Sequence, residues 1–416
     1  MKKSIILTVC LFNVVQAETP QYFDYAASWT VNEAALNEFD EVSRMNGNSS
    51  GINSHAKHLK KLEEQSAQVI ADKIGAQNLQ RIHFTSGATV ANNIAIFGVA
   101  YKNPKCHLIT SKIEHKSVLN VFKHLERNGW RVTYLNVDRY GHIDLKQLKD
   151  SVRPDTKLIS IQTFNSEIGT LQNISEIGKI AHEHGILFHS DASQSFCKYD
   201  INVDKLHIDL LTVSGYKIGS PKGIGALYVK DIEQLQPIIF GSGDILFPGT
   251  KPTALICAFA KAVETFKIDK TQITRNFEVL TSELRKIDNV YINSVTPSHV
   301  VSVSIDKVLL KDVLEAMEDF SFSAGCSCLG QDKSNVMTAI DPLDKLPNCT
   351  LRISFTDKTS EKQLINFAQK LKAVVERLRK EKSVGKGCES NVNTSGVNLN
   401  DSLDKITELI KIGVNK

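Results

Sequence analysis

Residues 186–217 read ILFHSDASQSFCKYDINVDKLHIDLLTVSGYK, and this stretch decides the fold of the chain. It contains two short apolar runs, Ile186 to His189 and Leu210 to Val213. Short apolar runs bounded by turn residues are typical of buried parallel strands. A carboxylate, Asp191, follows the first run and an amine, Lys217, follows the second. The pattern therefore predicts two neighbouring strands whose ends carry polar side chains.

The same pattern extends outward from this stretch. Other apolar runs that end in polar or glycine-rich turns are Ile82 to Phe84, His107 to Thr110 and Leu158 to Ile161. Helical patterns lie between the runs, for example at 174–184 and at 59–74, where Gly75 supplies a stop. Alternating strands and helices predict an α/β domain with a mostly parallel sheet, in which ligands bind at the carboxyl ends of the strands.

The pattern changes after about residue 260. Long helical stretches around 253–287 and 361–380 are separated by short strands such as 300–305 and 351–355. We expect a smaller α+β domain there. The predicted organisation is a signal segment at 1–17, a large domain with an N-terminal arm at 18–260, a small domain at 261–380 and a flexible tail at 381–416. The tail is expected to contain a short helix near 403–410.

Composition excludes some classes of function. Charged residues make up 23% of the 416 residues and hydrophobic residues 42%, which is ordinary for a globular protein. The net charge of +4 is small, and no Lys/Arg-rich run with interleaved aromatic residues is present. We therefore expect no nucleic-acid partner, and no apolar run is long enough to predict stable membrane insertion.

The N-terminus resembles a secretory signal peptide. Lys2 and Lys3 precede an apolar run from Ile5 to Val15, and Ala17 follows shortly after the run. The first arginine is Arg44, which argues against an arginine-rich organelle transit peptide. These features predict export to a periplasmic or secretory compartment. The alternative is a buried N-terminal strand in a cytoplasmic protein.

The eight cysteines are spread along the chain, which argues against a disulfide framework. Cys326-Ser327-Cys328 is the one close pair. A C-x-C motif without a second cysteine or histidine pair at matching spacing is a poor zinc site, so we expect no metal. A thiol role is favoured.

Three positions predict a site at the edge of the sheet. Ser86-Gly87-Ala88-Thr89 joins a strand to a helix, where N–H groups and a hydroxyl can hold a phosphate. Asp191 can pair with a protonated pyridine nitrogen, and Lys217 can form a Schiff base. Taken alone, each is better explained as an ordinary packing turn or a solvated side chain.

Taken together with other motifs, these positions give a specific resemblance. The chain from about 21 to 380 resembles the cysteine desulfurases of NifS/IscS type, within class V of the pyridoxal 5'-phosphate (PLP) dependent transferases of fold type I. The motifs that carry the resemblance are Tyr22-Phe-Asp-Tyr-Ala-Ala27, Phe84-Thr-Ser-Gly-Ala-Thr89, Thr110-Ser-Lys-Ile-Glu-His115, Glu167-Ile-Gly169, Asp191-Ala-Ser-Gln194, Ser214-Gly-Tyr-Lys217, Pro221-Lys-Gly-Ile-Gly225 and Ser323-Ala-Gly-Cys-Ser-Cys328.

The resemblance implies a set of cofactor contacts. Lys217 would bind PLP covalently, Asp191 would pair with the ring nitrogen, and His115 would stack on the ring. Gln194 would contact the ring hydroxyl. The phosphate would be bound by Ala88, Thr89, Ser214 and Tyr216, and Thr250 would reach the phosphate of a neighbouring subunit, which implies a homodimer.

The resemblance also implies the reaction. L-cysteine would bind through Arg352, with Asn165 and Ser166 near the substrate, and would leave as L-alanine. Cys328 would take the sulfur as a persulfide, with His115 as a candidate base. The sulfur would then pass to an acceptor, for example an iron–sulfur scaffold protein.

Three departures from the family pattern keep alternatives open. Tyr216 stands where a histidine is usual, Ser166 stands where an asparagine is usual, and the segment 241–249 lacks the usual arginines. The alternatives are a selenocysteine lyase or another class V aminotransferase, and a catalytically weakened homologue that acts as a binding or scaffold protein.

We expect the first 17 residues to direct export and to be removed, because of the order Lys2/Lys3, apolar run and Ala17. Cell fractionation with N-terminal sequencing of the purified protein checks this. Recovery of the intact Met1 form in the cytosol would contradict it.

Overall fold

A computed structural model of the chain describes residues 20–324, 334–341, 346 and 349–388, with side chains as far as residue 382. Residues 1–374 form one compact unit and residues 375–416 form another. The predicted signal segment 1–17, the Cys326-Ser-Cys328 motif and the predicted helix near 403–410 lie outside the described residues. Within the described ranges, no helix is both long enough and apolar enough to cross a bilayer.

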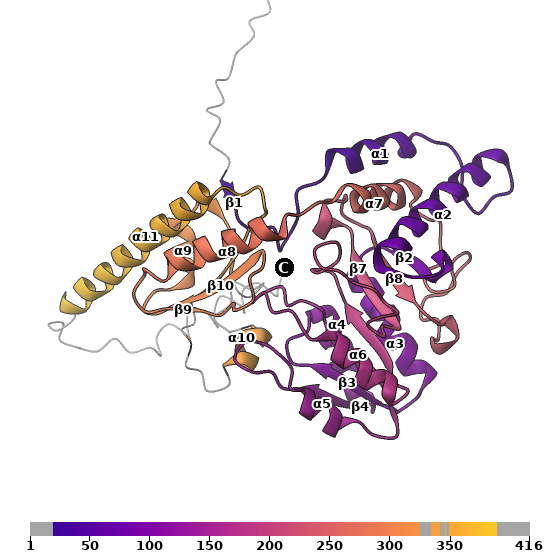
Figure 1. The fold of residues 1–416 in the computed structure, drawn as a ribbon, viewed down its shortest axis with the longest axis horizontal. Helices are drawn as coiled ribbons and strands as arrows, with labels where there is room; N and C mark the ends of the chain where they lie inside the picture. Colours follow the sequence, from indigo (N-terminus) through magenta and orange to yellow (C-terminus); the bar gives the residue numbers. More distant parts are fainter. Residues whose placement is uncertain (1–19, 325–333, 342–345, 347–348, 389–416) are drawn as a thin grey trace, which may run out of the picture. The chain divides into compact units, whose positions relative to one another are not determined.

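A seven-stranded sheet forms the centre of the first part of the chain (Figure 1). Neighbouring strands are parallel from β7 to β4, whereas β8 runs antiparallel to both β2 and β7. The prediction of a mostly parallel sheet is therefore confirmed, although β4 and β8 were not predicted. In spatial order the strands are β2 (Ile82–Thr85), β8 (Gly225–Val229), β7 (Leu210–Ser214), β6 (Leu187–Asp191), β5 (Thr156–Ser160), β3 (His107–Ser111) and β4 (Arg131–Leu135).

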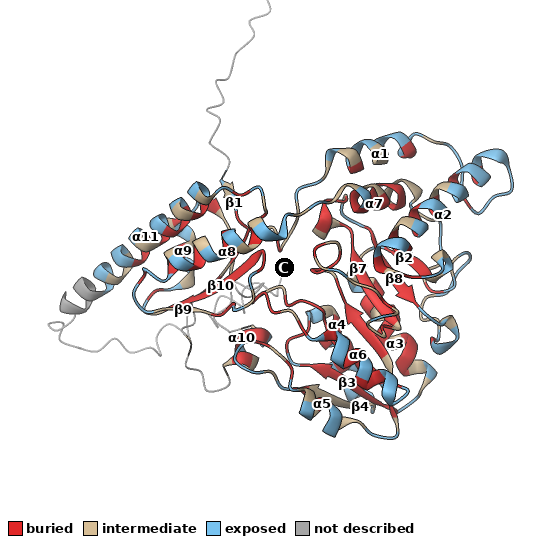
Figure 2. Cartoon of the chain, in the orientation of Figure 1, coloured by how far each residue is buried: buried red, intermediate tan, exposed pale blue. Residues whose placement is uncertain are grey.

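Both faces of this sheet are buried. Adjacent residues of one strand enter different hydrophobic clusters: Leu158 packs in one cluster and Ile159 in the other, and Leu210 and Leu211 divide in the same way. Side chains of a strand alternate between its faces, so a sheet that is covered on both sides needs continuous apolar runs. Figure 2 shows most strands of the sheet in the buried colour, the edge strand β4 mostly in the intermediate colour, and the covering helices with exposed outer faces.

Helices cover the sheet between the strands. The predicted helix at 59–74 is confirmed as α2, which begins earlier, behind the cap Asn53, and ends at Gly75 with φ 67°. The predicted helix at 174–184 is α6. The helices of this part are α1 (Glu33–Ser43), α2 (Ser54–Ile74), α3 (Ala88–Lys102), α4 (Lys116–Arg127), α5 (Leu145–Ser151), α6 (Ile174–Glu183) and α7 (Thr253–Thr265), with 3-10 turns η1 (Leu79–Arg81), η2 (Tyr216–Ile218) and η3 (Ile232–Gln234).

A four-stranded antiparallel sheet forms the centre of the later part. Its order is β12 (Ser323–Ala324), β13 (Cys349–Ser354), β10 (Val300–Ile305) and β9 (Val290–Ile292). Strand β1 (Gln21–Tyr22) comes from the N-terminal arm and pairs in parallel with β11 (Phe320–Ser321). The helices are α8 (Lys270–Leu284), α9 (Leu310–Ala316), α10 (Asn335–Ile340) and α11 (Glu361–Cys388).

Two predicted helices have different bounds in the structure. The stretch 253–287 is two helices, because Asp269 caps a new start by accepting hydrogen bonds from the N–H groups of Thr271 and Gln272. Helix α11 continues to Cys388, past the point at which the flexible tail was predicted to begin. The strands of the seven-stranded sheet all precede residue 260, and those of the four-stranded sheet all follow it. Residues 1–374 nevertheless form one compact unit. A domain boundary near residue 260 therefore stays a prediction.

A buried lysine joins the turns that follow β6 and β7. Lys198 is only 3% exposed, and its Nζ donates to the carbonyl oxygens of Gln194 at 3.2 Å and Lys217 at 2.9 Å. The same Nζ lies 5.0 Å from the ring centroid of Trp29 and 5.8 Å from that of Phe266. Burial, followed by the charge of Lys217, lowers the pKa of Lys198 to about 7. Lys198 therefore fixes the backbone of two predicted cofactor residues.

Replacing Lys198 with methionine should reduce the pH dependence of folding stability. Between the folded pKa of about 7 and the ordinary lysine value of about 10.4, the unfolded chain holds a proton that the folded chain does not. The Lys198 amine should therefore make the wild-type free energy of unfolding rise with pH in this window, by up to about 1.4 kcal/mol per pH unit. The Lys198→Met variant lacks this gain. Denaturant unfolding between pH 7 and 10 measures it.

The control is Lys60→Met, which removes an exposed lysine on α2. It should leave the pH dependence as in wild type. A constant stability difference between wild type and Lys198→Met across this pH range would show that Lys198 keeps its proton on folding.

Candidate active site

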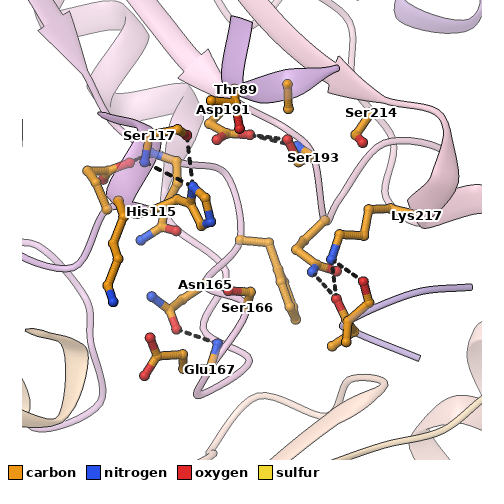
Figure 3. A pocket seen from close by; sticks show the side chains of 18 of the residues that line it. Thr89, His115, Ser117, Asn165, Ser166, Glu167, Asp191, Ser193, Ser214 and Lys217 are labelled. Carbon is orange, nitrogen blue, oxygen red and sulfur yellow. Dashed lines mark hydrogen bonds between the residues drawn. The ribbon is translucent and has the colours of Figure 1, made fainter. Parts of the chain in front are cut away.

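A pocket of about 930 Å³ lies at the carboxyl ends of the parallel strands and is also lined by residues of β12 and β13. Figure 3 shows His115 and Lys217 on opposite sides of it. Thr250 does not line it, and Cys328 lies outside the described residues. The predicted site residues that the structure brings together here are Ala88, Thr89, His115, Asn165, Ser166, Asp191, Gln194, Ser214, Tyr216, Lys217 and Arg352.

The turn before α3 opens one wall of the pocket. Gly87 has φ 143°, which favours glycine, and a Cβ there would meet nothing within 4 Å. Gly225 lets β8 approach this turn, because a Cβ on it would lie 2.9 Å from the Cα of Gly87. The first N–H groups of α3 have no carbonyl partner within the helix. This wall is therefore suited to an anion.

Asp191 is one carboxylate of the pocket and is held by three donors. Its Oδ1 accepts from the N–H of Ser193 at 2.9 Å and from the Ser193 hydroxyl at 2.5 Å. Its Oδ2 accepts from Asn92 Nδ2 at 2.8 Å. The lone pairs of a carboxylate allow one more donor at Oδ2. Asp191 can therefore accept a ring N–H.

His115 caps α4 and is oriented by Ser117. Its Nδ1 lies 3.1 Å from the Ser117 backbone nitrogen and 2.8 Å from the Ser117 hydroxyl. A backbone N–H can only donate, so Nδ1 accepts and the proton of the neutral ring is on Nε2. In this geometry His115 offers a donor from Nε2. A role as base would require the loss of the Ser117 contact.

Lys217 faces the N-terminal arm. Its Nζ donates to the carbonyl oxygens of Ala26 at 2.5 Å and Ala27 at 2.9 Å, and Gln194 Nε2 donates to the same Ala26 oxygen at 2.7 Å. Burial, followed by the charge of Arg352, lowers the pKa of Lys217 to about 8. More of this amine is neutral near pH 7 than in an ordinary lysine. Two further polar atoms of the pocket residues, the Gln194 Oε1 and the Ser214 hydroxyl, are buried without a partner.

Asn165 has a structural role that the sequence did not reveal. Its Oδ1 accepts from the N–H groups of Glu167 and Ile168, at 2.9 Å and 3.0 Å, and its Nδ2 donates to the Ile113 carbonyl. The side chain therefore closes the turn that ends at Gly169, whose φ is 75°. Only one Nδ2 hydrogen remains for a substrate.

Two buried carboxylates change the charge balance of the pocket. Burial raises the pKa of Glu114 to about 8 and that of Glu167 to about 7. Both are therefore largely or partly protonated near neutral pH. Arg352 keeps its charge, since arginine remains protonated in proteins. Loss of these two negative charges makes the pocket more favourable for a phosphate and a carboxylate.

Two residues of the site were not assigned from the sequence. Asn92 lies on α3 and connects Asp191 with Ser117, to whose hydroxyl it donates at 2.9 Å. Asp24 pairs with Arg352 at 2.8 Å. Asp24 belongs to one of the family motifs, which is a signal that could have found it; Asn92 carries no such signal.

The comparisons with known proteins agree with this geometry. The family "Aminotransferase class-V" matches residues 21–367. "Cysteine desulfurase IscS" of Histophilus somni (strain 2336) is 36% identical over 379 residues, which cover 86% of this chain and 94% of that protein. "Cysteine desulfurase IscS" of Buchnera aphidicola (strain 5A) is 34% identical and covers 91% of this chain and 98% of that protein.

Solved structures give the same result. The structure titled "SspA in complex with cysteine" is 37% identical with a TM-score of 0.74, and it covers 82% of this chain and 100% of that one. A "NIFS-LIKE PROTEIN" is 26% identical with a TM-score of 0.79, and it covers 86% of this chain and 100% of that one. The chain therefore belongs to the aminotransferase class-V family and, within it, to the cysteine desulfurases of NifS/IscS type.

Proposed function

We propose that this chain is a PLP-dependent cysteine desulfurase that converts L-cysteine to L-alanine and keeps the sulfur as a persulfide on Cys328. The observation that carries the proposal is the arrangement of Lys217, Asp191 and Arg352 in one pocket. It combines an amine with a lowered pKa, a carboxylate and a guanidinium. These are the groups that hold an aldehyde cofactor and an amino acid.

The pocket fits PLP. The buried Ser214 hydroxyl without a partner, together with Thr89 and the open space at Gly87, supports a phosphate site. Asp191 Oδ2 has room for a ring N–H, and the unpartnered Gln194 Oε1 supports a contact with the ring hydroxyl. When bound, PLP supplies an aldehyde for Lys217 and a protonated ring that accepts electrons. Tyr216 would replace the usual histidine as a donor to the phosphate.

The residues of the chain supply positioning and proton transfer. Arg352 binds the α-carboxylate of cysteine through its planar donors, as the substrate-binding residue proposed from the family pattern. Lys217, released as a free amine, takes the Cα proton, and its pKa of about 8 makes it a usable base near neutral pH. His115 can donate a hydrogen bond from Nε2, because its Nδ1 accepts from the Ser117 N–H.

The sulfur step belongs to Cys328. Its thiolate attacks the substrate sulfur, the carbon–sulfur bond breaks, and an S–S bond forms on Cys328. The three-carbon product takes protons from the site and leaves as alanine, so one cysteine and one thiol give one alanine and one persulfide. Transfer to an acceptor, such as an iron–sulfur scaffold protein, then frees Cys328 for another cycle.

A second copy of the chain is part of the proposal. The segment 241–249, which precedes Thr250, is tied to β2 by a 3.0 Å contact between Asp244 and His83. Burial alone would raise the pKa of Asp244, but the hydrogen bond and charge of His83 lower it to about 2. Phe240 beside this segment is 84% exposed. An anchored segment with exposed apolar side chains supports a homodimer in which Thr250 reaches the partner's phosphate.

Lys217 should carry the cofactor. The purified protein should be yellow, and Lys217→Ala should remove the visible absorbance, because no other group supplies the amine at this position. Borohydride reduction followed by peptide mass spectrometry locates the covalent link. In Lys222→Ala, which removes another pocket lysine, the link should remain. A reducible lysine adduct that persists in Lys217→Ala would sink the assignment.

Cys328 should be the sulfur carrier. Cys328→Ser should stay yellow, because Lys217 and Asp191 bind the cofactor independently of it. Its activity with cysteine should fall by orders of magnitude, roughly 100-fold or more, because a hydroxyl is far less nucleophilic than a thiolate at neutral pH. Alanine and sulfide production with added PLP and cysteine measures this.

Cys326→Ser is the matched control for this experiment and should remain mostly active. After incubation with cysteine, mass spectrometry of the peptide that holds both positions should find one added sulfur in Cys326→Ser and none in Cys328→Ser. The reverse pattern would assign the nucleophile to Cys326.

A further inference from the structure

Asp24 is a carboxylate beside the pocket that the mechanism above does not use. Its Oδ1 lies 2.8 Å from Arg352 Nη2, and its Oδ2 accepts from the Ser323 hydroxyl at 2.6 Å. The Ser323 oxygen in turn accepts from Arg352 Nη2 at 3.0 Å. The three side chains therefore form a closed triangle of hydrogen bonds. The side chains of Arg352 and Asp24 are 13% and 18% exposed, so water screens this ion pair only weakly.

The backbone fixes the position of Asp24 relative to β13. Asp24 forms a parallel bridge with Ser354, two residues after Arg352. The Ser354 N–H donates to the Phe23 carbonyl at 2.7 Å, and the Ala26 N–H donates to the Ser354 hydroxyl at 2.9 Å. The carboxylate therefore approaches Arg352 from a backbone that is itself bonded to the same strand.

The donors of Arg352 are only partly used. The two hydrogens of Nη2 point to Asp24 and Ser323, and Nη1 donates to the Ser166 carbonyl at 3.3 Å. The Nε–H is buried and has no partner. A buried donor without an acceptor is unfavourable, so an added acceptor gains most at this atom. Nε and Nη2 form one edge of the guanidinium, and a carboxylate can bind both atoms of such an edge.

We propose that Asp24 is a positioning residue that holds Arg352 with its Nε–Nη2 edge toward the substrate α-carboxylate. When this carboxylate binds, it replaces the Ser323 oxygen as the acceptor of one Nη2 hydrogen of Arg352. The proposal rests on the proposed function, because it takes Arg352 as the substrate-binding arginine. A bidentate carboxylate needs one Nη2 hydrogen. The substrate replaces Ser323 as acceptor more readily than Asp24, since a neutral hydroxyl is the weaker acceptor for a cation.

Steady-state kinetics of the holoenzyme test the role of Asp24. Asp24→Asn keeps the shape of the side chain and removes its charge. We expect the KM for cysteine to rise about tenfold, the equivalent of one charge-assisted contact, while kcat changes less than about threefold. If Asp24 merely competed with the substrate for Arg352, KM would fall. A lower or unchanged KM would overturn the proposal.

Ser323→Ala tests the exchange of partners. This variant removes the acceptor that the substrate displaces, so KM should stay the same or fall, opposite in sign to Asp24→Asn. A rise in KM as large as that of Asp24→Asn would contradict the exchange. The matched control is Asp155→Asn, which breaks an aspartate–arginine pair with Arg131 outside the pocket lining. It should leave KM unchanged.

Arginine labelling gives a readout that does not depend on turnover. A dicarbonyl reagent such as phenylglyoxal must reach the guanidinium nitrogens, and in wild type Asp24 occupies Nη2 as a charged acceptor. Without cysteine, Asp24→Asn should therefore label at Arg352 several-fold faster, while Arg377, which pairs with Glu381, labels at the wild-type rate. Equal labelling of Arg352 in both proteins would show that Asp24 does not hold it.

The proposed function and the positioning role of Asp24 can be contradicted separately. A wild-type holoenzyme that makes no alanine from cysteine would sink the proposed function, and the labelling would still test the contact between Asp24 and Arg352. An active wild type with unchanged KM in Asp24→Asn would sink only the positioning role.

Discussion

The parallel pairing of β6 with β7 is the constraint on which the rest of the site depends. Asp191, the last residue of β6, lies opposite Thr212 of β7, and the Ala192 N–H continues the ladder to the Thr212 carbonyl at 2.8 Å. Parallel strands end at the same edge of a sheet, so the residues after both strands meet there. Lys217 follows β7 within a 3-10 turn and therefore shares this edge with Asp191. A shift of one residue in either strand would point its side chains to the opposite face.

Burial then decides which charges the pocket keeps. The same loss of water raises the pKa of Glu114 and Glu167 and lowers that of Lys217. Both effects remove charge, one from acids and one from a base. Arg352 cannot respond in this way, because its guanidinium stays protonated. Among these four groups the fixed charge is therefore the arginine, and the adjustable groups are Lys217 and the two glutamates. This combination is suited to anionic ligands and leaves more of the amine neutral than in an ordinary lysine.

The sequence predicted much of this arrangement, for a physical reason. Buried strands and the turns after them have local signatures, so the edge that carries Asp191 and Lys217 could be found from apolar runs alone. Pairing partners have no such signature: the run at β8 does not reveal that it is antiparallel, and Asn92 contacts a carboxylate 99 residues away. Asn165 was expected near substrate, yet its amide closes a local turn. Lys198 contradicts the rule that lysines are exposed, and only the surrounding aromatic rings and carbonyl groups explain its burial.

The N-terminal arm connects the two ends of the pocket. Its carbonyl oxygens at Ala26 and Ala27 accept from Lys217, and its carboxylate at Asp24 pairs with Arg352. Covalent attachment of Lys217 requires Nζ to leave these carbonyl groups. The Ala26 oxygen then keeps the 2.7 Å bond from Gln194, so it is not left buried without a donor. The arm can therefore hold the free amine, and release of the amine leaves the Ala26 oxygen with a donor. A segment far from both residues in sequence thus joins Lys217 to Arg352.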